Sequence, residues 1–339
     1  LEQMMLAAKE NIGESRSELE KSVTNLENCL QQIRQKYILD EKQCAMEAFR
    51  EQFESGYTWI NGFLRNVERF GNREALAEPE SGKVWTYTQL NDEANRFAHA
   101  LLRSGLQKGD VVMAQLHNCP EFVFAYLACH KIGLVFCPVN FRLSAKELSG
   151  CMDNSCPKVF LMESENQENT DMALEWAKHA PEIILSTDSQ SEHSYEKFAD
   201  GCPETNPELP WDMYVFDETL RLFTSGTTGR QKSVCLTSIN EVLSAHDVMI
   251  NFPLSFTDRT MNTTPWFHRG GLHSGGITPT LYAGGTVVVQ RKFQAEQTLD
   301  CIEQQGLTFV IGVPNVLELM AEAQQKQPRN LHSLHGIVT

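Results

Sequence analysis

The first 55 residues carry an apolar pattern with the period of a helix. Apolar side chains recur at alternating spacings of four and three residues, at Leu19, Val23, Leu26, Leu30, Ile33 and Tyr37. Residues 1–55 contain no proline and a single glycine. The spacing is that of a coiled-coil seam, although coiled coils usually sustain it over about three to four heptads. We therefore predict a helical leader over residues 1–55, either packed against the rest of the chain or used for self-association.

From residue 56 onward, short apolar runs alternate with longer amphipathic stretches. The runs predict strands at residues 110–116, 134–139, 158–162, 182–186, 220–223, 286–290 and 307–313. The stretches between them predict helices at residues 119–133, 144–152, 238–250 and 295–306. Ser144 and Glu147 have the spacing of a capping box at the start of the second helix. Strands that alternate with helices predict an α/β fold with parallel-rich sheets and packed helices.

Composition narrows the class of protein. The formal net charge of −15 argues against a protein that grips nucleic acid by its overall field. No apolar run approaches the roughly 20 residues of a membrane span, and residues 1–15 do not resemble a secretory signal. The ten cysteines are scattered without C-x-x-C spacing. We expect a cytoplasmic protein with reduced, structural cysteines and no metal-cysteine site.

One loop combines small hydrogen-bond donors with two cationic side chains. Residues 222–233, LFTSGTTGRQKS, combine glycines and hydroxyl side chains with an arginine and a lysine. Between an expected strand and an expected helix, such a loop suits phosphate, because its amides converge and a helix N-terminus adds positive potential. Gly226, Lys232 and Ser233 fit a P-loop, but Gln231 stands where that motif needs its second glycine. A kinase or GTPase is therefore not favoured.

The longer run FTSGTTGRQKSVCLTSIN resembles the phosphate loop of the adenylate-forming superfamily. That superfamily contains acyl-CoA synthetases, luciferases and peptide-synthetase adenylation domains, and its loop is usually TSGTTGxPKGV followed by THxN. Gln231, Ser233 and Ser238 replace its proline, glycine and histidine, and the missing proline leaves one φ angle unfixed. Further segments resemble the family in order and spacing, at residues 86–112, 118–140, 143–148, 263–289 and 308–320.

The resemblance implies roles for individual residues. Lys232 would face the β- and γ-phosphates of ATP, and Thr224 also matches a family position near Mg²⁺. The loop would supply hydroxyl donors and an open backbone through Thr224, Ser225, Gly226, Thr227, Thr228 and Gly229.

A second segment, PWFHRGG at residues 265–271, resembles acyl-CoA and aryl-CoA ligases and luciferases more than peptide-synthetase domains. His268 matches the family histidine beside the reacting carboxylate, although the residues alone equally allow a histidine hydrogen-bonded within an apolar wall. Trp266 and Phe267 are expected to form the wall of the pocket and to take no part in the chemistry. Gly270 and Gly271 either allow close backbone approach or only turn the chain.

By this resemblance, the chain belongs to a two-step ligase. A small-molecule carboxylic acid attacks the α-phosphate of ATP to give an acyl-adenylate, and the thiol of coenzyme A then takes the acyl group. The resemblance also implies Mg²⁺ as a cofactor and a role in fatty acid metabolism. Two alternatives stay open: a ligase with a carrier-protein or other non-CoA acceptor, and a catalytically inactive nucleotide-binding or interaction module. The sequence ends before the family's GGAP-type turn. Residues 56–339 are therefore expected to form the N-terminal portion of the large domain, incomplete for activity by themselves.

Overall fold

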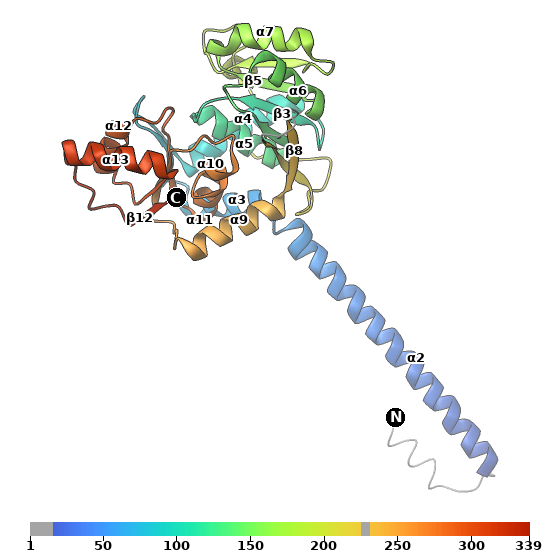
Figure 1. The fold of residues 1–339 in the computed structure, drawn as a ribbon. Coiled ribbons are helices and arrows are strands. Elements are labelled where there is room, and N and C mark those ends of the chain that lie inside the picture. Colours follow the sequence, from blue (N-terminus) through green and yellow to red (C-terminus); the bar gives the residue numbers. More distant parts are fainter. Residues whose placement is uncertain (1–15, 225–230) are drawn as a thin grey trace. The chain divides into compact units, whose positions relative to one another are not determined.

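The computed structural model describes residues 16–224 and 231–339, and these divide into two compact units between Glu54 and Ser55 (Figure 1). In the first unit, α2 (Arg16–Phe49) is a helix of 34 residues, followed by the π-helical turn η1 (Arg50–Ser55). At 1.5 Å per residue, α2 is about 51 Å long. It agrees with the helix expected from the apolar seam.

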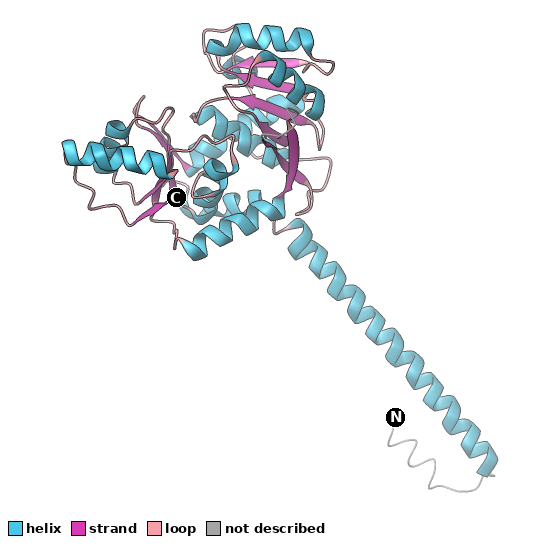
Figure 2. Ribbon diagram, viewed as in Figure 1, coloured by secondary structure: helices cyan, strands magenta, loops and turns pink. Residues whose placement is uncertain are grey.

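Strands of the second unit form two six-stranded sheets (Figure 2). The first sheet has the order β12 (Gly336–Val338), β11 (Phe309–Ile311), β9 (Arg259–Asn262), β10 (Thr286–Val288), β1 (Glu74–Glu78), β2 (Lys83–Thr86). The second has the order β6 (Ile183–Ser186), β5 (Val159–Met162), β3 (Val111–Gln115), β4 (Val135–Pro138), β7 (Glu218–Thr224), β8 (Lys232–Thr237). All neighbours are parallel except β1–β2 and β7–β8, so the α/β class with parallel-rich sheets is confirmed.

Helices connect and cover these strands. They are α3 (Trp59–Phe70), α4 (Tyr87–Arg103), α5 (Pro120–Ile132), α6 (Ala145–Ser155), η2 (Ser164–Asn166), α7 (Gln167–Trp176), α8 (Tyr195–Ala199), α9 (Ser238–Asn251), α10 (Arg269–His273), α11 (Ile277–Ala283), α12 (Ala295–Gln305) and α13 (Pro314–Lys326). The capping box predicted at Ser144 and Glu147 is formed at the start of α6. α5 begins with Pro120 and ends at Ile132, and its C-cap residue Gly133 has a φ of 72°, the left-handed conformation that glycine adopts readily.

The main core surrounds α5. Every residue of this helix except Glu121 is buried, which explains why its sequence is apolar on all sides instead of amphipathic. Its aromatic side chains pack with Trp59 of α3 and with Trp266, and this cluster extends to strands of both sheets. A second cluster joins α6 to the second sheet, and a third joins α12 and α13 to the first sheet. The central strands β3, β4 and β5 are buried along their whole length, as expected for parallel strands covered on both faces.

Among the described residues, no helix has the length and apolar character needed to cross a membrane. All ten cysteines are free thiols, and four of them, Cys119, Cys129, Cys137 and Cys151, are buried.

Candidate active site

The phosphate-loop motif lies on a β-hairpin. β7 ends at Thr224 and β8 begins at Lys232, and these two residues are paired in the antiparallel ladder. Residues 225–230 lie outside the described part, so the roles predicted for Ser225, Gly226, Thr227, Thr228 and Gly229 stay predictions.

The expected order of strand, loop and helix was wrong at one step. A second strand, β8, follows the loop, and the helix α9 starts only at Ser238. The reason is local: Thr237 and Asn240 form a capping box that fixes the helix start, while the preceding residues satisfy their backbone in the ladder with β7. The N-terminus of α9 is therefore separated from the loop by the length of β8.

The two ends of the hairpin carry the polar groups that the sequence singled out. Thr224 is exposed, and its hydroxyl donates to the backbone oxygen of Lys232 at 3.4 Å. The Lys232 side chain is also exposed and makes no ion pair with any described residue. Its charge is thus available to an anion near the loop.

Gln231, which stands where the family has proline, is held by a side-chain contact. The thiol of Cys151, on α6, donates to Oε1 of Gln231 at 3.2 Å. Burial raises the pKa of this thiol to about 12, so it stays protonated and able to donate. The contact ties the hairpin to α6 at the position where the missing proline leaves φ unfixed.

A cavity lies at the carboxyl ends of two adjacent parallel strands. Its volume is about 450 Å³, and it is bordered by Pro138 at the end of β4 and Thr224 at the end of β7. The remaining lining residues are Val139, Asn140, Leu143, Leu222, Phe223, Gln231, Val234, Leu236, Phe267, His268 and Arg269. Open α/β sheets bind ligands at this edge, and a mostly apolar wall with a few polar groups is typical of small-molecule sites.

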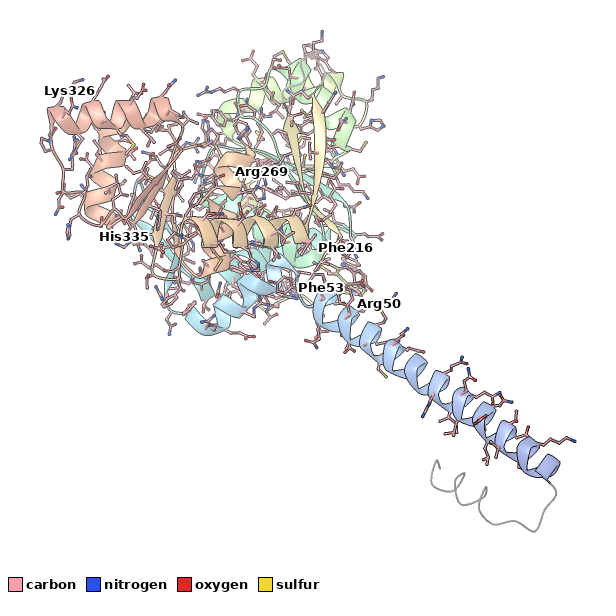
Figure 3. The ribbon with its side chains drawn as sticks, turned by 60° about the horizontal axis from the view of Figure 1, so that its bottom comes forward. Arg50, Phe53, Phe216, Arg269, Lys326 and His335 are labelled. Atoms are coloured by element: carbon pink, nitrogen blue, oxygen red, sulfur yellow. The ribbon has the colours of Figure 1, made fainter. Side chains whose placement is uncertain are left out.

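The cavity brings together two of the predicted site residues, Thr224 and His268, while Lys232 lies outside its lining. His268 caps the N-terminus of α10, which starts at Arg269 (Figure 3), and its Nδ1 accepts a hydrogen bond from the backbone N–H of Gly270 at 3.1 Å. A neutral ring with Nδ1 as acceptor carries its proton on Nε2. The side chain is exposed and hydrogen-bonded in a mostly apolar lining, so the alternative of a histidine hydrogen-bonded within an apolar wall stays open. The role beside a carboxylate stays a prediction.

The turn before His268 is fixed by backbone contacts. The side chain of Asn118 accepts from the N–H of Trp266 at 2.8 Å and donates to the backbone oxygen of Thr264 at 3.3 Å. A Cβ atom on Gly271 would lie 2.1 Å from the backbone oxygen of Pro265, so this glycine permits a close approach. Of the two aromatic residues expected to be wall, Phe267 lines the cavity and Trp266 is buried in the core.

A buried polar network contacts α10 at its last residue, His273. The sequence analysis did not predict this network. Glu241 of α9 is fully buried. One of its oxygens, Oε1, lies 2.8 Å from Nε2 of His273, and the other, Oε2, accepts from the hydroxyls of Tyr126 and Thr278. Burial alone raises the pKa of Glu241, but His273, His130 and the Tyr126 hydroxyl lower it to about 2. An acidic residue on the apolar face of the predicted helix 238–250 was the available signal.

A second ion-pair network lies at the carboxyl ends of β3 and β5. Glu163 is buried and contacts Nδ1 of His117 and Nη1 of Arg291, each at 2.6 Å. Glu165 lies 3.4 Å from His117 and 3.5 Å from Arg291. His117, Glu163 and Glu165 could in principle ligate a metal ion. Arg291 pairs with both carboxylates, and Nζ of Lys292 lies 4.0 Å from Glu165. Because Arg291 follows β10, the network ties the two sheets together.

Comparison with known proteins identifies the family of the chain. A family model described as AMP-binding enzyme matches residues 63–339, and the chain belongs to this family. The indoleacetate–CoA ligase of Aromatoleum aromaticum is 32% identical over 283 residues, which are 83% of this chain and 54% of that protein. The fatty acid–[acyl-carrier-protein] ligase ScoC of Streptomyces coeruleorubidus is 31% identical over 242 residues, which are 70% of this chain and 45% of the relative.

Among solved structures, the anthranilate CoA ligase AuaEII in complex with anthranoyl-AMP superposes with a TM-score of 0.75 and 21% identity. The match covers 82% of this chain and 54% of that one, and at this identity it shows a shared fold alone. The resemblance found in the sequence is thus confirmed for the family and the fold. The chain spans about half the length of the relatives it matches.

Proposed function

We propose that this chain forms the phosphate- and carboxylate-binding part of an ATP-dependent ligase. The ligase activates a carboxylic acid as an acyl-adenylate and then transfers the acyl group to coenzyme A. The observation that carries the proposal is the cavity at the ends of β4 and β7, with Thr224 and His268 in its lining. Membership of the AMP-binding family supports the same chemistry.

The first step must bring two anions together, because a carboxylate attacks a triphosphate. Positioning and neutralisation of charge therefore dominate the barrier. In the proposal, Lys232 and the loop hydroxyls hold the β- and γ-phosphates, while Nε2–H of His268 donates to the carboxylate. Transfer to a thiol follows directly from the adenylate, so no covalent intermediate on the protein is needed.

The lining also indicates the kind of acid. Leu222, Val234, Leu236 and Phe267 give the cavity apolar walls. These walls favour an acid with an apolar body, such as a fatty or an aromatic acid, because the body loses water on entry.

Mg²⁺ fits this set of residues poorly on its own. Within the described lining, no side chain is a carboxylate, and Thr224 offers one hydroxyl oxygen. Mg²⁺ at nucleotide sites usually takes one or two carboxylates together with phosphates and waters. The contact of Thr224 with Mg²⁺ therefore stays a prediction, and no step here depends on it.

A carrier protein is the second candidate acceptor. The similarity to ScoC, an acyl-carrier-protein ligase, is as high as that to the CoA ligase, at 31% against 32% identity. Thioester formation with coenzyme A and with a phosphopantetheinylated carrier protein, measured side by side, separates the two acceptors.

We also propose that the seam on α2 mediates self-association. Its apolar positions repeat at coiled-coil spacing, and pairing with a second copy would bury them.

Binding of acyl-sulfamoyl-adenosine analogues tests the ligase proposal. Calorimetric titration of the chain with short, fatty and aromatic analogues should give the tightest binding for an apolar acyl group. The variant His268→Ala should weaken this binding, whereas His332→Ala, an exposed histidine elsewhere, should not. An absence of binding for every analogue, together with no acid-dependent exchange of pyrophosphate into ATP, would contradict the proposal.

A further inference from the structure

Lys131, near the end of α5, carries its amine in the protein interior. The residue is 7% exposed. Its Nζ donates to Oδ1 of Asn91 on α4 and to Oδ1 of Asn206, which follows α8, both at 2.7 Å. Both acceptors are neutral amides. Lys108, by contrast, pairs with a carboxylate, whereas no described carboxylate lies within ion-pair distance of Lys131.

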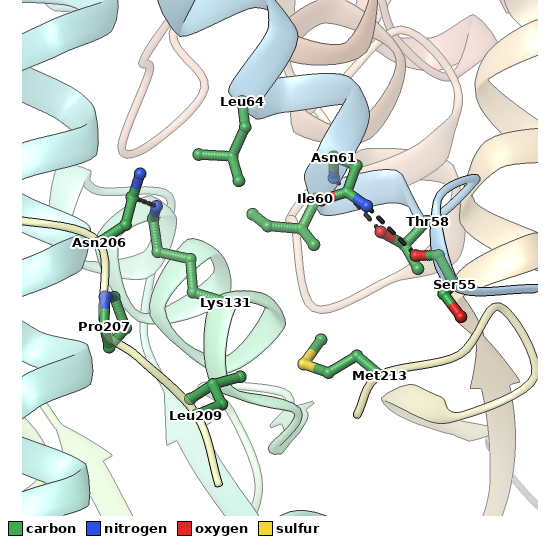
Figure 4. Close-up of a pocket in the computed structure, with 10 residues that line it drawn as sticks. All are labelled: Ser55, Thr58, Ile60, Asn61, Leu64, Lys131, Asn206, Pro207, Leu209 and Met213. Atoms are coloured by element: carbon green, nitrogen blue, oxygen red, sulfur yellow. Dashed lines mark hydrogen bonds between the residues drawn. The ribbon is translucent and has the colours of Figure 1, made fainter. Parts of the chain in front are cut away.

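A cavity of about 180 Å³ lies against this lysine (Figure 4). Lys131 and Asn206 line one side, and Ile60 and Leu64 of α3 lie on the other. The remaining lining residues are Ser55, Thr58, Asn61, Pro207, Leu209 and Met213. This volume is many times the roughly 10–15 Å³ that one water molecule needs on this measure, so a group of several heavy atoms fits beside the amine. No other charged side chain lines the cavity within the described residues.

The surroundings favour the uncharged amine. Burial lowers the pKa of Lys131 from its usual 10.5 to about 7, and the charge of Asp92 on α4 opposes this shift only in part. A large share of the side chain is therefore the free base at neutral pH, and the free base is the nucleophilic form.

We propose that Lys131 is an acyl-acceptor site, to which a short acyl thioester transfers its acyl group inside this cavity. The lone pair of Nζ attacks the carbonyl carbon of the thioester, and the carbon–sulfur bond breaks. The sulfur leaves as thiolate and takes up the proton that the amine loses, so the products are an amide and a free thiol. The step consumes no oxidant or reductant.

The cavity suits this product better than a charged one. The amide is neutral and needs no counterion, and its single N–H can still donate to Asn91 or Asn206. A carbamate formed from carbon dioxide would be an anion, and the lining supplies no cation to pair with it. The ligase proposed above would make thioesters, but the acceptor role does not depend on that activity because the thioester can be added.

Acetylation rates measured on the intact chain test this proposal. The chain is incubated at pH 7 with S-acetyl-N-acetylcysteamine or, in a second arm, acetyl-CoA, and each lysine is followed by peptide mass spectrometry. At pH 7, a pKa of about 7 makes the free-base fraction of the amine roughly 1,500-fold larger than that of an ordinary lysine. A less basic amine is also a weaker nucleophile, and a Brønsted coefficient of about 0.5 lowers its reactivity roughly 50-fold. We therefore expect Lys131 to react about 30-fold faster than exposed Lys83 and Lys146.

The pH profile and one variant sharpen the test. The rate at Lys131 should level off above about pH 8. Asn206→Asp places a carboxylate beside the amine, keeps it protonated and should slow Lys131 at least ten-fold at pH 7 without removing the nucleophile. Reaction with the small thioester, with or without acetyl-CoA, supports the proposal. A rate at Lys131 no higher than at the exposed lysines in both arms overturns it, as does an unchanged rate in Asn206→Asp.

Discussion

Replacing Glu241 by glutamine should destabilise the protein through the loss of one buried charge. Its three hydrogen-bond partners, Tyr126, Thr278 and His273, face this carboxylate with donors. Nε2 of His130 also lies 3.9 Å from Oε2. A glutamine amide cannot accept at both ends, so in Glu241→Gln the new NH₂ group must face either the two hydroxyls or the ring of His273. If it faces His273, the ring proton moves to Nδ1, which has no hydrogen-bond partner among the described residues.

The magnitude follows from the same contacts. The pKa of Glu241 falls from 4.5 to about 2 in the folded protein. A depressed carboxyl pKa stabilises the folded state above the unfolded pKa, and the stabilisation is lost as pH falls toward the folded pKa. At about 1.36 kcal/mol per pH unit, the charge contributes about 3 kcal/mol at pH 7 and about 2 kcal/mol at pH 3.5.

Urea unfolding of wild type and Glu241→Gln, followed by tryptophan fluorescence, measures this difference. We expect a gap in unfolding free energy of about 3 kcal/mol at pH 7 that narrows by about 1 kcal/mol at pH 3.5. Glu322→Gln, an exposed glutamate on α13, is the control and should change stability by less than about 0.5 kcal/mol. Equal stability of wild type and Glu241→Gln, or a gap that does not change with pH, would refute the reasoning.

Three further outcomes are expected. Lys232→Ala should weaken ATP binding by about 1.5–3 kcal/mol with an unchanged melting temperature, and equal affinity in a nucleotide titration would remove Lys232 from the site. Gly271→Ala should destabilise the fold because its Cβ would lie 2.1 Å from the backbone oxygen of Pro265. In the control Gly270→Ala, the Cβ would meet only a side chain, at 3.4 Å. Equal melting temperatures of the two variants would contradict this. Deleting residues 1–50 should leave ATP binding intact and reduce association in sedimentation; lost binding by a folded body would argue otherwise.

Local signals in the sequence predicted much of the fold. The apolar runs at 110–116 and 158–162 became β3 and β5 because buried parallel strands leave a continuous apolar signature. The capping box at Ser144 worked because it is a contact between near neighbours. The strand β8 was missed, since residues 232–237 alternate only weakly and become a strand through pairing with β7, which is contact between distant parts of the sequence.

The residues of the candidate site also divide into those that the sequence predicted and those that it did not. Thr224 and His268 were found by motif, and their place in one cavity agrees with the family resemblance. Glu241 and Asn118 were not found, because each acts on a segment far away in sequence: Glu241 on His273, and Asn118 on the turn at Trp266. A single sequence contains no direct signal for such pairs, apart from the anomaly of a charge within an apolar face.

These distant contacts connect the two halves of the site. The hairpin that ends at Thr224 and Lys232 continues through β8 directly into α9, and α9 carries Glu241. Glu241 holds His273 at the end of α10, and the residue that caps the other end of this short helix is His268. The side chains proposed to face phosphate and carboxylate are thus joined by one continuous path of strand, helix and buried hydrogen bond. Since precise placement of reacting groups depends on such supporting contacts, loss of the Glu241 charge should loosen His268 relative to Thr224 as well as lower stability.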